Sequence, residues 1–444
     1  NAGHRSTLTY DSNGNLTNVS NENNSGTNLT YDSSKQVTSV KSTDHNNGSS
    51  MTYDSHGNVL ETLSGVLGSD DKVLTTQPYM QTGTANGNYA VSQTDERGYT
   101  TSYGIDALSG LTTSVTDALN RTTQYSYDAN SWNLLSMQTG NAAVSFEYSA
   151  ANRLTSILHN GFRYGMQYDT FGNLTSIKIG NRSLVNYAYG SGNGYLSATS
   201  YGNGDAYGYT YDAYGRVTAI SVNGTEKYTV TYDAKGNTAT ATDAYTGRSQ
   251  EYTYDQSGNV IRVQQPGYSD IRMYTQSDLQ SQTVYAFGGQ QKAFTLTQNT
   301  DGLNSTATLI SGLTAQKTYD TLNRETIYAI GASLKRQLTY ENVSGNRTTS
   351  IPSAVSYQFG GSNLLNVNYT YDAVGNISTM VQDGVTYTYT YDSLNQLTAV
   401  ATSDNSYTAA FNYDNGGNLT SKTVNGQTYT YSYGDTEWKD LLTA

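Results

Sequence analysis

The dipeptide Tyr-Asp occurs twelve times in this chain of 444 residues, and six of the eleven steps between neighbouring copies are 20 to 22 residues long. Two steps of 41 and 43 residues span two periods each, and Tyr148 and Tyr189 mark a degenerate copy of the repeat within each step. A fixed period means that one small structural unit is stacked on itself. No charged, Pro-rich or Ser-rich linker interrupts the repeat, so residues 1–444 are predicted to form a single continuous array, an interior fragment of a larger protein.

Each repeat begins with a β-strand signal. In Tyr387-Thr-Tyr-Thr-Tyr391 aromatic and small hydroxyl residues alternate with the strand period of two, in residue types that favour strands. A second strand such as 217–222 follows and often ends in a two-residue hairpin signal, as at Asn223-Gly224, Asp383-Gly384 and Asn425-Gly426, which fit type I′ turns. Each repeat is therefore predicted to be strand, turn, strand, turn, with one face of the sheet formed by a tyrosine ladder.

The turn between the two strands has the pattern Asp-x-x-Gly-Asn. Gly supplies a positive φ at little cost, and an Asp carboxylate at the turn entrance accepts nearby backbone N–H groups. Asn323 and Asn395 replace the Gly in two copies, which supports a conformational role. The residues predicted to form this structural motif are Tyr10, Asp11, Gly14, Tyr53, Asp54, Gly57, Tyr168, Asp169, Gly172, Tyr211, Asp212, Gly215, Tyr232, Asp233, Gly236, Tyr254, Asp255, Gly258, Tyr371, Asp372 and Gly375.

The fold class that follows is all-β, with tandem antiparallel hairpins forming one long sheet. Tight turns at both ends of every strand require antiparallel neighbours, and about forty strands would result. Because neighbouring strands are rotated by about 20–25°, a sheet of this length must coil or close on itself. Helix-period patterns are nearly absent, apart from the stretch near Trp438.

Composition excludes several functions. Hydrophobic residues make up 35% of the chain and include 42 Tyr, so a thick core is not expected. The net charge is −12 and no Lys/Arg run occurs, which argues against nucleic acid and anionic membranes as partners. No apolar run approaches the length of a membrane span, the first residues lack a signal-peptide core, and the absence of Cys excludes disulfides without assigning a compartment.

The repeat unit resembles the YD repeat of the Rhs family. The resemblance is carried by Tyr168-Asp-Thr-Phe-Gly-Asn-Leu-Thr-Ser-Ile177 and Tyr211-Asp-Ala-Tyr-Gly-Arg-Val-Thr-Ala-Ile220, and Asp117-Ala-Leu-Asn-Arg-Thr122 resembles another frequent phrase of that family. It covers almost the whole chain, with weaker copies around residues 65–100, 262–318 and 341–368. The family includes bacterial polymorphic toxins, Gram-positive wall-associated proteins, insecticidal toxin complexes and teneurins.

This resemblance implies a β-sheet strip that spirals into a hollow shell, which in the toxins encloses a variable C-terminal effector. Residues 433–443 are similar to a stretch that precedes the conserved core in wall-associated members. The core's Asp-Pro-x-Gly phrase has no match, because none of the three Pro, at 78, 266 and 352, follows Asp. No autoprotease is therefore assigned.

No residue is predicted to be catalytic, to bind a cofactor or to hold a metal. Twelve carboxylates in identical contexts indicate turn capping, since general acid–base catalysis needs one or two groups in distinct environments. Asp11-Ser-Asn-Gly-Asn15 has only the start of a calcium loop, which leaves calcium a minor possibility. His4, His45, His56 and His159 lack metal-ligand spacing and are expected at the surface.

The function predicted on these grounds is a non-enzymatic, encapsulating β-shell segment of a secreted or cell-surface Rhs or wall-associated protein, which sequesters a C-terminal toxin domain. The alternative is an adhesion module whose tyrosine ladders bind carbohydrate or cell-surface glycans. In that case glycan binding would depend on exposed rings such as Tyr389 and Tyr431. Cross-strand aromatic pairs, which stabilise a sheet by about 0.2–1 kcal/mol each, favour the structural interpretation.

Overall fold

A computed structural model describes residues 6–21, 26–43, 47–67, 73–74, 89–275, 279–299, 302–309, 311–343 and 347–444. No helix occurs in these residues, which agrees with the predicted all-β class. The strands are β1 (Ser6–Tyr10), β2 (Leu16–Asn21), β3 (Gly26–Tyr31), β4 (Val37–Ser42), β5 (Asn47–Tyr53), β6 (Val59–Val66), β7 (Val73–Leu74), β8 (Ser92–Thr94), β9 (Thr100–Ile105), β10 (Thr112–Thr116), β11 (Thr122–Tyr127), β12 (Leu134–Thr139), β13 (Ala142–Tyr148), β14 (Leu154–His159), β15 (Phe162–Tyr168), β16 (Leu174–Ile179), β17 (Arg182–Tyr189), β18 (Leu196–Tyr201), β19 (Ala206–Tyr211), β20 (Val217–Val222), β21 (Thr225–Tyr232), β22 (Thr238–Asp243), β23 (Arg248–Tyr254), β24 (Val260–Gln265), β25 (Tyr268–Tyr274), β26 (Gln280–Phe287), β27 (Gln290–Gln298), β28 (Asn304–Thr308), β29 (Thr314–Tyr319), β30 (Glu325–Ile330), β31 (Leu334–Val343), β32 (Arg347–Phe359), β33 (Ser362–Tyr371), β34 (Ile377–Gln382), β35 (Val385–Tyr391), β36 (Leu397–Thr402), β37 (Thr408–Tyr413), β38 (Leu419–Val424) and β39 (Gln427–Thr430).

These strands pair with their neighbours in the chain, as the tandem-hairpin prediction requires. Strands β1 to β6 form one antiparallel sheet, and every strand from β8 to β39 pairs antiparallel with the next in a second sheet. The described strands thus form two sheets where one ribbon is predicted. Between β6 and β8 the only described strand is β7, which pairs in parallel with β32, far away in the sequence.

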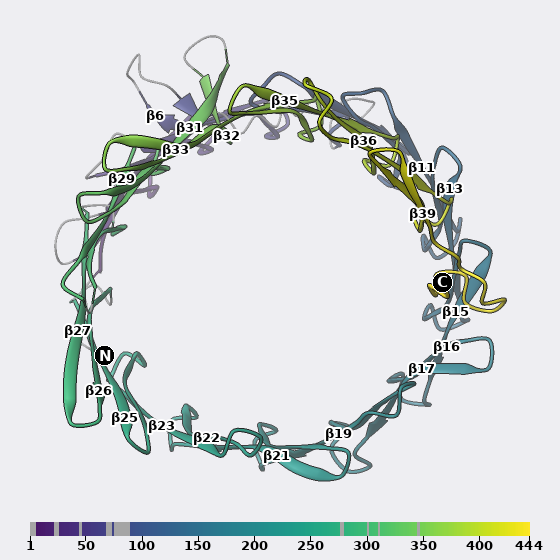
Figure 1. Cartoon of the computed structure of the whole chain (residues 1–444), viewed down its shortest axis with the longest axis horizontal. Coiled ribbons are helices and arrows are strands. Elements are labelled where there is room, and N and C mark those ends of the chain that lie inside the picture. Colours follow the sequence, from purple (N-terminus) through teal and green to yellow (C-terminus); the bar gives the residue numbers. More distant parts are fainter. Residues whose placement is uncertain are drawn as a thin grey trace.

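The long sheet curves into a ring and overlaps itself (Figure 1). The chain passes from β9 along the wall through β15, β21 and β27, and then returns so that β35 to β39 run beside β11 to β17. Hydrogen bonds between these two passes join residues 253 to 280 positions apart in the sequence. The ribbon is therefore a spiral whose full turn takes roughly this number of residues, and the sheet twist expected of so many strands explains why it cannot stay flat.

Consecutive turns lie on opposite edges of the ribbon, because antiparallel strands reverse direction at each turn. The turns that follow Tyr-Asp, such as 169–173 and 212–216, lie on one edge, which we call the YD edge. The two-residue hairpins, such as Asn160-Gly161 and Asn223-Gly224, lie on the other, which we call the hairpin edge. Asn223 and Gly224 both have positive φ, as the predicted type I′ turn requires.

A β-bulge recurs at the YD end of the repeat. Gln167 pairs with Ser176 but Tyr168 pairs with Leu174, so that Thr175 is an extra residue in the second strand. The same register shift precedes the conserved Tyr in the other repeats. Because a bulge bends the strand and increases its local twist, a bulge in every repeat curves the whole ribbon in one sense.

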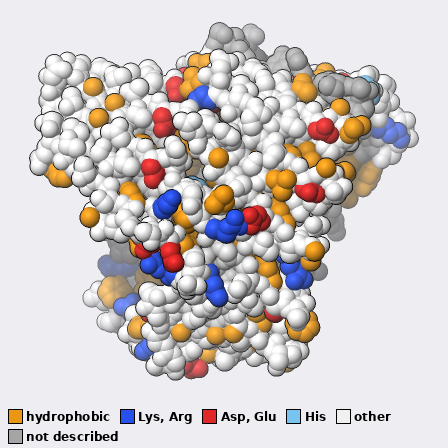
Figure 2. All heavy atoms as spheres, turned by 90° about the vertical axis from the view of Figure 1, so that its right-hand side faces the viewer, with side chains coloured by type: hydrophobic (Ala, Val, Ile, Leu, Met, Phe, Trp, Pro, Cys, Tyr) orange, Lys and Arg blue, Asp and Glu red, His pale blue; other side chains and the backbone are white. Residues whose placement is uncertain are grey.

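The wall is thin, as the composition predicts. Few hydrophobic side chains are buried among the described residues, and Ile179 is the largest of them that is fully enclosed. On the outer face seen in Figure 2, hydrophobic and charged side chains are scattered among small polar ones. The stability of the wall must therefore come from many similar local contacts spread along it.

The stretch near Trp438, where the sequence has its one helix-like pattern, forms no helix. The Asp435 carboxylate instead accepts the backbone N–H groups of Glu437 and Trp438, and only a single tight turn follows, from the Leu441 N–H to the Trp438 carbonyl. This segment lies across the hairpin ends of β14 to β17, and contacts with them replace the helical hydrogen bonds.

Candidate functional site

The Asp of each repeat organises the turn at the YD edge. One carboxylate oxygen of Asp169 accepts the backbone N–H groups of Phe171 and Asn173, each at 2.9 Å, and the other accepts the Asn173 side-chain amide at 2.9 Å. Gly172, between them, has a φ of 96°, which a residue with a Cβ rarely adopts. The consensus Asp-x-x-Gly-Asn is thus one closed set of local hydrogen bonds.

The other predicted motif residues occupy the same positions. The glycines all have φ between 80° and 96°, at Gly14, Gly57, Gly172, Gly215, Gly236, Gly258 and Gly375. The carboxylates accept hydrogen bonds from the residue four positions later, at Asp11, Asp54, Asp169, Asp212, Asp233, Asp255 and Asp372. At Asp11 both oxygens are engaged in this way, so the calcium interpretation gains no support from the geometry.

The conserved Tyr joins each repeat to the one before it. The Tyr168 hydroxyl donates to the Leu154 carbonyl at 2.7 Å, and Leu154 is the residue at the bulge of the preceding repeat. Equivalent bonds of 2.6 to 3.0 Å are made by Tyr53, Tyr211, Tyr232, Tyr254 and Tyr371, whereas Tyr10, on the first strand, is exposed. The ring therefore fills the wall while its hydroxyl satisfies a main-chain carbonyl of the neighbouring repeat.

Two features of this linkage lie outside the Tyr-Asp pairs, although the repeat spacing already marks Tyr189 as a copy. Tyr189, Tyr274, Tyr340 and Tyr433 lack a following Asp but make the same hydroxyl-to-carbonyl bond, 14 or 15 residues back. The extra residue of the bulge is often Thr, and the Thr175 hydroxyl donates to the Gln167 carbonyl at 3.1 Å. The sequence signal is a Tyr 14 or 15 residues after the first residue of the second strand of the preceding repeat, which is Leu followed by Thr for Tyr189 and Tyr433.

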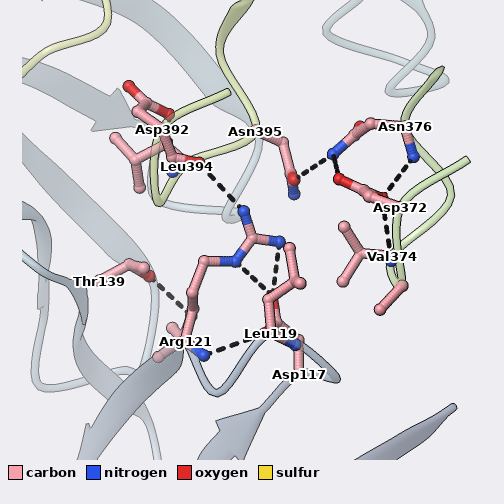
Figure 3. A network of polar contacts seen from close by, with 12 residues as sticks. Asp117, Leu119, Arg121, Thr139, Asp372, Val374, Asn376, Asp392, Leu394 and Asn395 are labelled. Carbon is pink, nitrogen blue, oxygen red and sulfur yellow. Dashed lines mark hydrogen bonds and ion pairs between the residues drawn. The ribbon is translucent and has the colours of Figure 1, made fainter. Parts of the chain in front are cut away.

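Charged side chains with several hydrogen bonds and ion pairs lie where successive turns of the spiral meet. We call this region the seam. There the hairpin edge of the earlier pass faces the YD edge of the later pass. The Arg121 guanidinium forms an ion pair with one carboxylate oxygen of Asp117, in its own turn. It also donates to the Asp392 carbonyl at 3.0 Å (Figure 3). Arg97 makes the corresponding bonds to the carbonyls of Asp372 at 2.8 Å and Ala373 at 3.3 Å.

These two arginines belong to turns that differ from the rest of the hairpin edge. Where many hairpins of this edge have two-residue ends, residues 95–99 and 117–121 form Asp turns that each carry an Arg side chain reaching the later pass. Arg97 and Arg121 are 6% and 14% exposed, compared with 30% for Arg216, which has the same place in its turn as Arg121 but makes no bond to a later pass. Buried guanidinium groups bound to carbonyls fix the register between the passes.

The irregular C-terminal segment continues the seam. The Asp440 carboxylate accepts the side-chain amides of Asn418 at 2.8 Å and Asn160 at 3.3 Å, and lies 3.5 Å from the His159 ring. Arg182 pairs with Asp435 at 2.8 Å. The contacts of Asn160, His159 and Arg182 attach the later pass to hairpin ends of β14 to β17.

A long hairpin, formed by β31 and β32, also joins the later pass to the earlier one. Strands β31 and β32 have ten and thirteen residues, and the far end of β32 pairs with β7. At this far end Thr348 and Thr349 are fully buried, and the Arg324 guanidinium donates to the Thr348 hydroxyl at 3.0 Å and to the Thr349 carbonyl. The hairpin is thereby held against the wall where it reaches the earlier pass.

Removing the seam arginines is expected to loosen the overlap without unfolding the wall. In an Arg97→Met, Arg121→Met double variant, hydrogen exchange in turns 372–376 and 392–396 should accelerate by about tenfold, because their carbonyl contacts are lost. Arg216→Met is the matched control, since it removes a guanidinium–Asp212 pair with no cross-pass bond. Equal exchange rates in the double variant and the control would contradict the assignment of the seam.

The pH dependence of stability follows from the turn carboxyls and the wall tyrosines. The Asn173 side chain and backbone N–H groups hold the pKa of Asp169 below its usual value. Burial alone would raise the pKa of Asp117, but hydrogen bonds from Arg121 outweigh it and the pKa is lowered. Burial raises the pKa of Tyr391.

A carboxyl whose pKa is lowered in the folded state stabilises the fold at pH values above its unfolded pKa. This stabilisation is lost as the pH falls through its folded pKa. A Tyr with a raised folded pKa stabilises the fold below its unfolded pKa, and this is lost as the pH rises through the folded value. The thermal midpoint should therefore be level between about pH 5 and 9 and fall on both sides. A midpoint unchanged at about pH 3 and pH 11, measured by circular dichroism, would contradict this prediction.

Of the remaining candidates, His4 and His45 lie outside the described residues. His56 is exposed beside Asp54, and His159 belongs to the seam. The exposed tyrosines are Tyr10, Tyr99, Tyr195, Tyr201, Tyr214, Tyr228, Tyr245 and Tyr429, which lie on separate strands and turns, while Tyr389 and Tyr431 are half-buried. The described residues thus present no continuous exposed aromatic face of the kind that glycan stacking needs. No helix in the described part of the chain is long or apolar enough to cross a membrane.

Tandem hairpins, a bulge in every repeat and a spiral course define the class of protein as a YD-shell. Residues 66–245 match the family model of the teneurin YD-shell. This match and the repeat itself make the chain similar to proteins of the YD/Rhs-repeat family. No curated protein matches the sequence.

Solved structures share the fold at low sequence identity. A TcdB2–TccC3–TEV crystal structure superposes with a TM-score of 0.64 at 13% identity, over 97% of this chain and 27% of that one. The Tc holotoxin pore of Photorhabdus luminescens gives a TM-score of 0.54 at 13% identity, over 92% of this chain and 26% of that one. This chain thus spans about a quarter of the length of those structures.

Proposed function

We propose that this protein is a segment of an encapsulating shell, which encloses a toxin domain and keeps it from targets and proteases until delivery. The observation that carries the proposal is the seam, because it joins successive passes of the spiral edge to edge into a continuous wall. A strip that only displayed residues for binding would not need its passes sealed to each other. The work of such a wall is mechanical and requires no catalytic group.

The setting proposed for this shell is a secreted or cell-surface protein of bacterial polymorphic-toxin or wall-associated type. Supporting it are the YD-shell match and the likeness to the TcdB2–TccC3 and Tc holotoxin structures. The partner is then a toxin domain of the same polypeptide. In this proposal the chain is not an enzyme and needs no cofactor.

Protection of an attached polypeptide tests the proposal. A disordered, protease-sensitive reporter is joined after Ala444, and its half-life with proteinase K is compared with that of the same reporter on an unrelated folded protein. Containment predicts a several-fold longer half-life, which should shorten in the Arg97→Met, Arg121→Met variant as the seam opens. Equal half-lives on the two carriers would overturn containment.

A further inference from the structure

A recess of about 300 Å³ lies on one face of the wall, across strands β27 to β30. Its floor is formed by Ala307 and Ala315, which lie directly opposite each other on β28 and β29. Phe294 and Leu296 line one side and Tyr328 lines the other, and the two short side chains between them leave the space unfilled. Each of the four strands is paired on both sides, so the recess belongs to the interior of the sheet rather than to an edge.

One end of this recess is charged. Lys317 lies two residues after Ala315, on the same face of β29, and pairs with Tyr328 of the next strand. Its ammonium forms an ion pair with Glu325 at 2.9 Å and lies over the Tyr328 ring, 5.7 Å from the centroid. Arg336 forms a second ion pair with the same carboxylate. Two cations share one carboxylate, so this end has one excess positive charge in a chain whose net charge is −12.

The Lys317 ammonium has donors to offer a ligand. A lysine carries three N–H donors and no acceptor, and Glu325 occupies one of them. The Lys317 side chain is 41% exposed, so its other donors are accessible from solvent at the end of the recess. The recess therefore combines an apolar floor and apolar sides with one cationic, hydrogen-bonding end.

We propose that this recess binds a small amphipathic anion, with a carboxylate at Lys317 and an unbranched apolar chain along Ala307 and Ala315. Charge complementarity selects the head group, because an ammonium binds a carboxylate more strongly than a neutral acceptor. The low floor between larger side chains selects the tail, because each methylene placed there leaves water. A recess of this volume is at the small end of ligand sites, which favours a free medium-chain carboxylate over a whole lipid. This site is a property of the wall and does not depend on the presence of a cargo.

Isothermal titration calorimetry of the whole chain with octanoate tests the proposal. Octanoate should bind at one site with a dissociation constant of about 1 mM or below. From butanoate to octanoate the affinity should rise about fourfold for each added methylene. Octylammonium has the same tail and the opposite charge, and should bind at least about tenfold more weakly. Absence of saturable octanoate binding, or equal affinities for octanoate and octylammonium, would overturn the proposal.

Two variants separate the head group from the tail. Lys317→Gln removes the charge and keeps a polar side chain, so the affinity for octanoate should fall at least about tenfold. Ala307→Leu fills the floor and should abolish binding of octanoate, with the fold checked by circular dichroism. If the Ala307→Leu chain does not fold, Lys317→Gln decides alone, and an affinity unchanged in that variant would contradict the site.

The matched controls make the same changes on the other face of the sheet. Lys335→Gln and Ala293→Leu alter residues that adjoin Arg336 and Phe294, and successive residues of a strand point to opposite faces. Both controls should bind octanoate like the unaltered chain, and a loss as large as in the recess variants would refute the assignment. Flotation of the chain with vesicles of phosphatidylcholine and phosphatidic acid, lost in the recess variants, would assign the recess to a membrane surface and overturn a free ligand.

Discussion

Replacing Asp414 by Ala is expected to lower the free energy of unfolding of the wall more than any other single turn substitution. This carboxylate accepts the backbone N–H groups of Gly416 and Asn418, the Asn418 side-chain amide, and, across the seam, the Asn160 amide at 3.1 Å. At about 1 kcal/mol for each bond, reduced because the turn is partly open to solvent, the loss should be about 2–3 kcal/mol. Denaturant-induced unfolding followed by circular dichroism measures it.

The matched control for this result is Asp169→Ala. Asp169 makes the same bonds within its turn but lies on the free YD edge, so its replacement should lower the free energy of unfolding less. The difference between the two variants isolates the contribution of the seam. Equal losses would mean that the contact between Asn160 and Asp414 adds nothing to stability.

Removing three consecutive tyrosine hydroxyls is expected to have an effect of similar size. In a Tyr371→Phe, Tyr391→Phe, Tyr413→Phe variant the rings remain, but the carbonyls of Pro352, Ile377 and Leu397 lose their donors. At about 1 kcal/mol for each hydroxyl the triple variant should lose about 3 kcal/mol, and the losses should be nearly additive because the sites lie in successive repeats.

The control for the hydroxyl series replaces three exposed tyrosines, in a Tyr214→Phe, Tyr245→Phe, Tyr429→Phe variant. These rings lie on turns and strand ends rather than at the bulge of a neighbouring repeat. Their loss of hydroxyls should leave the unfolding midpoint almost unchanged. If the Tyr371, Tyr391 and Tyr413 triple variant had the same unfolding midpoint as this control, ring packing alone would hold successive repeats together.

Local features of the fold could be predicted because adjacent residues determine them. Asn323 and Asn395, which replace Gly in the turn, have a φ of 62°, as expected for the residue most tolerant of that conformation after Gly. The sequence predicts a tyrosine ladder that acts through ring pairs, and the ring centroids of Tyr195 and Tyr211 lie 5.1 Å apart. The hydroxyl-to-carbonyl bond was not anticipated, since it depends on a bulge whose position shows only in the pairing register.

What the sequence determined by itself is the unit: two strands, an Asp turn and a hairpin, in an antiparallel all-β ribbon. The period of the motif and the turn residues are sufficient for that, because each unit is stabilised by contacts within about twenty residues. Only the tertiary structure decided which units meet after one turn of the spiral. Arg121 and Arg216 bind the Asp of their own turns in the same way, yet only Arg121 reaches another pass. The physical reason is that the circumference of the spiral is the sum of many small strand rotations and bulge bends, and no single repeat encodes that sum.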